Sequence, residues 1–310
     1  MRTLLIIAGF FLLIFQHLFI ATAQHIEFLV FIISIILLGI PHGAADLLVA
    51  NKNATINHQL FSKFTFLFIY ILRLSIFALI IWFSPVIGNL LFILFAAYHF
   101  GETDLHQFET NHILGKLFIV SYGLLIISTI LLHHFNDVKQ IFLLFESGKK
   151  YLSLLNWIET NRYAIVITVG IFFLFSTVAF FVKYALYKDL KNGLFLIRLL
   201  LILFILYNLP MLLGFTFYFV FWHSFLSLNY IFKYLKNNHV YSNTIIFKQV
   251  LLYSVLAILG ILIFGVIGFM FTNKDAMAGY IFLGLAVLTV PHMQVMHTMY
   301  NNIRTKSRLI

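Results

Sequence analysis

Long apolar stretches interrupted by single histidines constrain this chain more than any other feature. Apolar runs long enough to cross about 30 Å of hydrocarbon recur throughout its 310 residues. Of these residues 62% are hydrophobic and 10% are charged, and the mean hydropathy is +1.02. Because a soluble globular chain carries about 25% charged residues, this chain requires the bilayer as its solvent. We therefore expect an all-α, polytopic transmembrane helical bundle with a histidine-lined interior.

The apolar stretches predict about ten spans in a single integral membrane domain that covers residues 1–310. The first stretch is longer than the apolar region of a secretory signal peptide, which is about 7–15 residues, so we interpret it as a span. The polar connection at about 136–162 alternates Phe, Leu and Trp with Lys and Glu, a pattern typical of an interfacial amphipathic segment. The predicted spans are 3–22, 26–50, 64–83, 86–106, 115–135, 163–184, 194–208, 211–233, 246–271 and 277–300.

The distribution of Lys and Arg predicts the orientation. With ten spans, one side of the membrane collects most of the basic residues, whereas nine spans would mix the two sides. By the positive-inside rule this side is cytoplasmic. We therefore expect a multi-pass protein of the cell (plasma) membrane with both termini in the cytoplasm. The basic residues on that side are Arg2, Lys52, Lys63, Lys116, Lys183, Lys188, Lys191, Lys233, Lys236, Lys248, Arg304, Lys306 and Arg308.

Four of the thirteen histidines interrupt strongly apolar spans. Ionisable groups at membrane depth are costly and mark a functional interior. All four lie on even-numbered spans that run from outside to inside, about 18–24 Å below the start of each span at 1.5 Å per residue. Imidazoles that lie at a similar depth in the membrane can bind a single metal ion together. The four are His42 in GIPHGAAD, His99 in AYHFGETD, His223 in FWHSFLSLN and His292 in TVPHMQVMH.

Acidic residues follow two of these histidines closely. Asp46 comes four residues after His42, on the same helical face. Glu102 comes three residues after His99, again on the same face. We expect each carboxylate to accept the second ring N–H of its histidine as an outer partner. Asp104 lies about 140° around the helix from His99 and is expected to cap or end the helix.

Ligand chemistry narrows the choice of metal. The chain has no cysteine, so disulfides and thiolate ligands are excluded. An all-imidazole site suits iron, copper, nickel or zinc, and neutral ligands in an apolar setting suit dioxygen binding beside a lipid-soluble substrate. A transporter or channel that uses the same histidines as a metal or proton relay is the alternative, and a bis-histidine haem carrier is another. No nucleic-acid partner is expected, because the net charge of +10 comes from basic residues at span ends.

At these residues the chain resembles the Brp/Blh family of membrane β-carotene 15,15′-dioxygenases. The resemblance covers about residues 40–295, and the first two motifs at this separation in a polytopic chain are fairly specific. It implies central cleavage of β-carotene by O2 into two retinal molecules at histidine-bound Fe(2+), and a functional link to a microbial rhodopsin. The matching stretches are Pro41-His42-Gly43-Ala44-Ala45-Asp46, His99-Phe100-Gly101-Glu102-Thr103-Asp104, Trp222-His223-Ser224 and Pro291-His292-Met293.

One position departs from the family pattern. Family members often carry a second histidine one turn after the Trp-His-Ser histidine, and here that position is Ser227. If that histidine is a ligand in the family, this chain either recruits His292 instead or holds the metal with three histidines. His297, five residues after His292, faces another direction and is expected to be a histidine of the cytoplasmic end.

Overall fold

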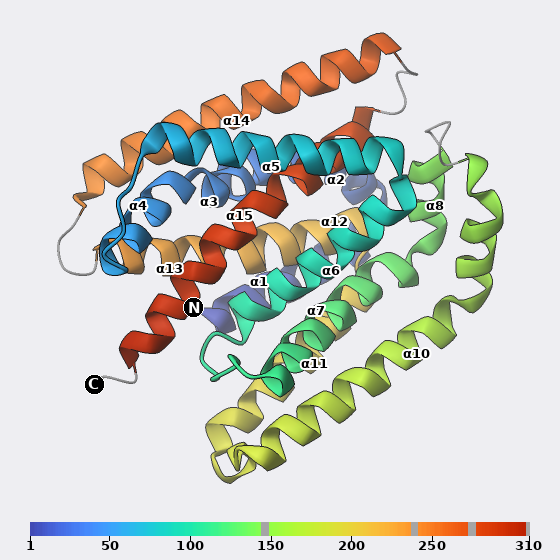
Figure 1. The fold of residues 1–310 in the computed structure, drawn as a ribbon. Coiled ribbons are helices and arrows are strands. Elements are labelled where there is room, and N and C mark those ends of the chain that lie inside the picture. The colour runs from blue at the N-terminus through green and yellow to red at the C-terminus, as the bar shows by residue number, and fades with distance from the viewer. Residues whose placement is uncertain (144–148, 237–240, 272–276, 308–310) are drawn as a thin grey trace.

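The computed structural model describes residues 1–143, 149–236, 241–271 and 277–307, and these residues form helices and short connections without a strand. Figure 1 shows one bundle, with α14 (Asn243–Phe271) and α10 (Leu152–Lys183) along opposite edges. The predicted all-α class is confirmed. The remaining helices are α1 (Arg2–Leu18), α2 (Ile20–Ser34), the π-helix η1 (Ile35–Gly39), α3 (Ile40–Ala44), α4 (Asp46–Ile56), α5 (Lys63–Phe83), α6 (Pro85–Asp104), α7 (Ile113–His133), α8 (Phe135–Leu143), the 3₁₀-helix η2 (Leu186–Lys188), α11 (Leu190–Asn208), α12 (Met211–Phe215), the π-helix η3 (Thr216–Ser224), α13 (Phe225–Lys236) and α15 (Met277–Ser307).

Within the described residues, seven helical segments are long and apolar enough to cross a membrane. Two further apolar helices, Arg2–Leu18 and Asn192–Asn208, are shorter. The predicted count of about ten spans included these two helices and α15 as well. The helical membrane bundle is therefore confirmed as a class. The start of α1 and the last turns of α15 lie near one another (Figure 1), since Arg2 donates to the Tyr230 hydroxyl and the Tyr230 ring lies 6.5 Å from that of Tyr300.

The predicted interfacial segment at 136–162 falls on two helices. α8 covers its first part, and α10 begins at Leu152, before the predicted start of the span at 163. Residues 144–148 lie outside the described part of the chain. The interfacial location of this segment stays a prediction.

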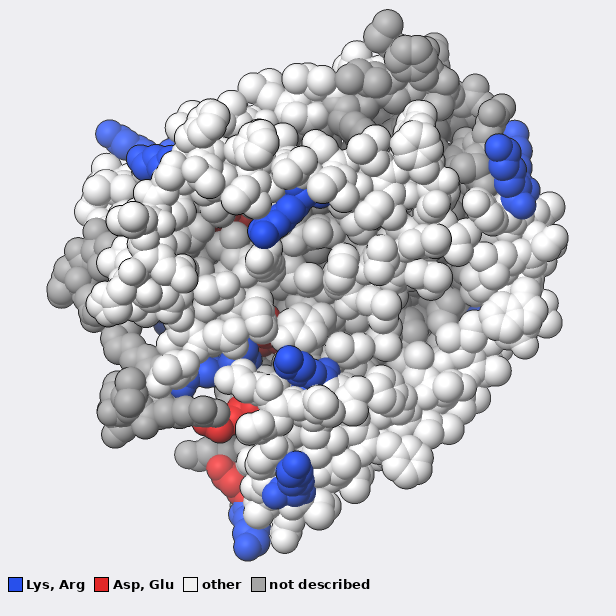
Figure 2. Space-filling view, viewed as in Figure 1, with Lys and Arg blue, Asp and Glu red and all other residues white. Residues whose placement is uncertain are grey.

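The surface of the bundle carries large apolar side chains that water would not favour. Phe11, Phe175 and Leu200 are each about two-thirds exposed, at 68%, 70% and 66%. Figure 2 shows a face that is mostly free of charged side chains, with Lys and Arg in small separate patches. A soluble monomer rarely exposes contiguous apolar patches larger than a few hundred Å². The bilayer is the environment that such a surface fits.

Close packing of α6 on α7 fixes one wall of the interior. Gly101 of α6 and Gly123 of α7 lie directly against the backbone of the facing helix. A Cβ on Gly101 would overlap the carbonyl of Ile119, and one on Gly123 would overlap the carbonyl of Ala97. Because glycine lets two helix backbones approach in this way, α6 is held rigidly, and with it the residues from His99 onward.

Two π-helical turns interrupt the spans that carry histidines. η1 (Ile35–Gly39) lies just before His42, and η3 (Thr216–Ser224) contains His223. Pro41 follows η1 and lacks the N–H that a regular helix would use at that position. π-helical turns inside α-helices are rare and occur frequently at functional sites. Both interruptions lie where the interior histidines gather.

Candidate metal centre

The four predicted histidines lie together in the interior of the bundle. They come from α3, α6, η3 and α15, and none is more than 5% exposed. Each ring lies edge-to-face against two of the others, so the four form a closed square. The ring centroids are 4.7 Å apart for His99–His223, 4.8 Å for His42–His292, 5.0 Å for His99–His292 and 5.5 Å for His42–His223.

Ring nitrogens from three of these histidines point at one small volume. One nitrogen each of His42, His99 and His223 lies within 4.8 Å of the other two. The Nε2 atoms of His99 and His223 face each other at 3.1 Å. Metal–imidazole bonds are about 2.1 Å long, so nitrogens at adjacent coordination positions lie about 3 Å apart. The His99–His223 separation fits two ligands of one shared ion, and the nitrogen of His42 lies close enough to be a third after a small shift.

His292 contacts His42 and His99 through its ring, but its nitrogens are not part of the group of three that lies within 4.8 Å. Its Nε2 is buried and has no hydrogen-bond partner among the described residues. His99 Nδ1 and His223 Nδ1 are also buried without a hydrogen-bond partner among the described residues. A buried polar atom left unsatisfied costs about 1–3 kcal/mol. His292 Nε2 is therefore the candidate for a fourth ligand atom.

The outer nitrogens of His42 and His292 are held by hydrogen bonds. His42 Nδ1 donates to the carbonyl oxygen of Gly39 in η1. His292 Nδ1 donates to Asp46 Oδ1 at 2.7 Å, and Tyr70 donates its hydroxyl to Asp46 Oδ2 at 2.9 Å. Such partners fix the orientation of a ligating ring and leave its other nitrogen for the metal. In both histidines Nδ1 is therefore occupied by a hydrogen bond, and Nε2 is the nitrogen that can bind a metal ion.

The predicted partner of Asp46 was wrong. Asp46 accepts from His292, 246 residues away in the sequence, and His42 uses the backbone instead. The physical reason is a break in the helix. Ala45 separates α3 from α4 with φ −79° and ψ −5°, so Asp46 is not one regular turn beyond His42. Asp46 still lies directly behind the histidine square, as the partner of a different ring.

The predicted partner of Glu102 was also wrong. Glu102 is fully buried, and its Oε1 accepts from Arg304 Nη2 at 2.9 Å and from His297 Nδ1 at 2.8 Å. A buried carboxylate needs a full positive charge nearby, and Arg304 on α15 supplies it where a neutral His99 ring would not. His297 lies outside the square and binds Glu102, so Glu102 joins α6 to α15 beside the histidines.

Aromatic side chains form an apolar wall against the square. The Phe100 ring lies 4.7 Å from that of His223. The Phe219 ring lies 6.0 Å from that of His42 and 6.2 Å from that of His223. Tyr70, behind Asp46, is a further neighbour. These three residues could not be predicted, because an aromatic residue in an apolar span is ordinary and its contacts here come from distant segments.

Just beyond α6, the connection to α7 holds one more histidine, which is partly buried. Burial lowers the pKa of His106 to about 4, so its ring is neutral at pH 7. Its Nδ1 lies 2.9 Å from the carbonyl oxygen of Thr103, which makes Nδ1 the protonated nitrogen. His106 therefore has a structural role at this end of the bundle.

The fold and the cluster together define a helical membrane protein with a buried histidine site that can hold a metal ion. The family model described as Beta-carotene 15,15′-dioxygenase matches residues 33–300. The chain belongs to this family of carotenoid-cleaving dioxygenases. A β-carotene 15,15′-dioxygenase from uncultured marine bacterium 66A03 is 27% identical over 265 residues, which are 84% of this chain and 89% of that protein. No solved structure matches the chain.

Proposed function

We propose that the chain cleaves β-carotene centrally with O2, at a ferrous ion bound by His42, His99, His223 and His292. The observation that carries this proposal is the closed square of four buried imidazoles in a member of this family. The reaction breaks the central C=C bond and forms two C=O bonds, one on each retinal molecule. Both oxygen atoms come from O2, so no external electron donor is needed.

The donor set fits iron. Neutral imidazoles suit iron among the metals that nitrogen donors bind, and a ferrous ion bound there would supply the binding and activation of O2. Asp46 lies behind His292 and makes that ring a stronger donor. No carboxylate belongs to the square itself.

The aromatic wall fits a polyene substrate. Phe100 and Phe219 give an apolar surface beside His223, and they keep water from the square. β-carotene has no polar group, so its recognition depends on apolar contact and shape. We expect these two rings to line the substrate path.

The membrane setting follows from the substrate and product, which are both lipid-soluble. We place the protein in the cell membrane with both termini in the cytoplasm, because the positive-inside rule favours that orientation. The retinal released into the bilayer is the chromophore that a microbial rhodopsin needs, and such a rhodopsin is the expected recipient.

The geometry favours this proposal over a transporter or channel. A relay needs titratable groups spread along a path across the membrane. The four histidines instead lie in one place, each within 5.5 Å of two others. Ligands of a single bound ion are clustered in this way.

Expression in a β-carotene-producing bacterium tests the proposal. We expect the cells to lose their orange colour and to accumulate retinal, measured by chromatography of extracted pigments. The matched control is the His99→Ala variant at the same expression level, which should leave the colour unchanged. Unchanged β-carotene beside folded, iron-loaded wild-type protein would refute the assigned substrate.

A further inference from the structure

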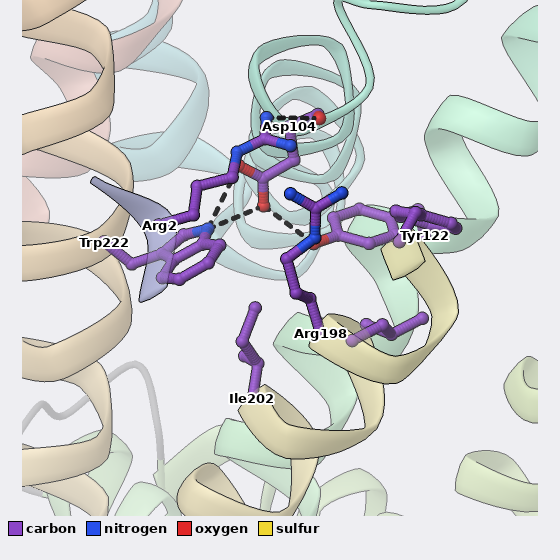
Figure 3. Close-up of a pocket in the computed structure, with 8 residues that line it drawn as sticks. Arg2, Asp104, Tyr122, Arg198, Ile202 and Trp222 are labelled. Carbon is purple, nitrogen blue, oxygen red and sulfur yellow. Dashed lines mark hydrogen bonds between the residues drawn. The ribbon is translucent and has the colours of Figure 1, made fainter. Parts of the chain in front are cut away.

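Asp104, the last residue of α6, does more than end its helix. It is 3% exposed, and its carboxylate accepts three hydrogen bonds from other helices. Tyr122 donates to Oδ2 at 2.7 Å, Tyr218 donates to Oδ2 at 3.0 Å, and Trp222 Nε1 lies 3.0 Å from Oδ2 and 3.1 Å from Oδ1. Figure 3 shows Tyr122 and Trp222 approaching this carboxylate from opposite sides. The carboxylate thus joins α6, α7 and η3.

Two arginines lie near Asp104. Arg2 Nη2 donates to the main-chain oxygen of Asp104 at 3.0 Å. Arg2 and Arg198 line the small cavity beside the carboxylate (Figure 3). Hydrogen bonds to an ionised carboxylate are about twice as strong as those between neutral groups. The three bonds to Asp104 are therefore strong enough to influence the shape of the segments that donate them.

Two of the three donors precede His223 on the π-helix η3. Tyr218 comes five residues before His223, and Trp222 comes immediately before it. In an α-helix, residues five apart point about 140° away from each other. A π-helix closes its hydrogen bonds between residues five apart, so such residues share a face. In η3 both Tyr218 and His223 indeed contact Phe100 of α6, with ring centroids 5.3 Å and 4.7 Å away.

This shared face matters because it decides where His223 points. The Nε2 atom of His223 lies 3.1 Å from that of His99 on α6. If η3 relaxed to an α-helix while Tyr218 kept its bond to Asp104, His223 would turn away from α6. π-helices are rare and short, so the π-helical form needs contacts that favour it over the α-helix. Asp104 provides such contacts at Tyr218 and Trp222.

We propose that Asp104 is a positioning residue that holds η3 in its π-helical form and thereby turns His223 towards His99. Asp104 touches neither the histidine square nor a substrate. It acts through Tyr218 and Trp222. The inference deepens the proposed function, on which it rests for the identity of the ion, since it concerns how the fold aligns two of the donors.

Metal binding by the purified full-length protein tests this role. The Asp104→Asn variant keeps the size of the side chain and replaces one acceptor oxygen by a donor, which conflicts with the three surrounding donors. We expect its affinity for Fe(2+) and Co(2+) to fall by up to about 10-fold, the lower end of the effect of changing a direct outer partner of a metal ligand, because Asp104 acts on His223 through Tyr218 and Trp222. The visible spectrum of the Co(2+)-loaded protein should change as well, because it reports ligand geometry. Tyr218→Phe and Trp222→Phe should change the same spectrum.

Tyr122→Phe is the matched control. It removes a hydroxyl donor from the same Oδ2 atom, but from α7 and not from η3. We expect it to lower the melting temperature and to leave the cobalt spectrum unchanged. A wild-type spectrum and affinity in Asp104→Asn would overturn the proposal, as would a spectral change in Tyr122→Phe as large as that in Tyr218→Phe.

Two further outcomes distinguish a failure of this inference from a folding defect and from a failure of the proposed function. If Asp104→Asn fails to fold, the comparison of Tyr218→Phe with Tyr122→Phe decides the question alone. If the wild-type protein binds cobalt and the variants shift its spectrum as expected, but β-carotene is not cleaved, the positioning role stands and the proposed function fails.

Discussion

Replacing His99 by Ala is expected to remove bound iron and to reduce retinal formation more than about 100-fold, beyond the usual effect of changing an outer partner. The His99 ring is central to the square, because it contacts His223 at 4.7 Å and His292 at 5.0 Å and its Nε2 faces His223 Nε2. His42→Ala and His223→Ala should have the same effect. The measurements are iron per chain by elemental analysis and retinal by chromatography.

His17→Ala is the control for this series. His17 lies near the end of α1 and is exposed, so its replacement should leave iron and activity unchanged. Stoichiometric iron in all three square variants would contradict a shared site.

Further replacements of the same kind identify the fourth ligand of the metal ion. His292 contacts His42 and His99 and has a free, buried Nε2, whereas Ser227 is a buried serine of α13. We expect His292→Ala to weaken iron binding, and the added Ser227→His replacement to restore part of it. Full iron binding by His292→Ala alone would show that three histidines suffice.

Replacing Glu102 by Ala is expected to lower the free energy of unfolding by about 3–5 kcal/mol, the usual cost of removing one partner of a buried ion pair. Arg304 is 5% exposed and would lose this carboxylate, and His297 would lose its acceptor. The loss should also loosen α15 against α6, where His292 and His99 meet. Unfolding of the purified protein in detergent measures the effect.

A double replacement separates charge from packing. Glu102→Leu with Arg304→Met removes both charges and keeps apolar volume, and replacing a whole buried pair in this way is often neutral or stabilising. We expect the double variant to recover most of the lost stability. A loss under about 1 kcal/mol in Glu102→Ala, or an equal loss in the double variant, would show that the ion pair contributes little.

Composition and hydrophobic patterning were enough to predict the helical membrane bundle, because an apolar surface admits few alternatives to helices in lipid. They also selected four histidines that the fold brings together, since a histidine deep in an apolar span is costly wherever it lies. The roles predicted for Asp46 and Glu102 stay predictions, and the partners expected for both were wrong.

The partners could not be predicted because they depend on features without a local signal. Asp46 meets His292 only because Ala45 breaks the helix and because α15 returns to α4 after more than two hundred residues. Tyr218 shares a face with His223 only in a π-helix, whereas a regular α-helical spacing would separate them. Asp104 ends α6, as expected, but its hydrogen-bond donors could not be predicted because they come from η3 and α7.

The most direct test of the central claim is the stoichiometry of the reaction in vitro. Purified, iron-loaded protein in detergent is incubated with β-carotene and a measured amount of O2, and consumption and products are followed together. Central cleavage at the histidine square predicts two molecules of retinal for each β-carotene and each O2 consumed, with no added reductant. Products of unequal chain length, or no consumption of O2 by protein that carries stoichiometric iron, would contradict the account.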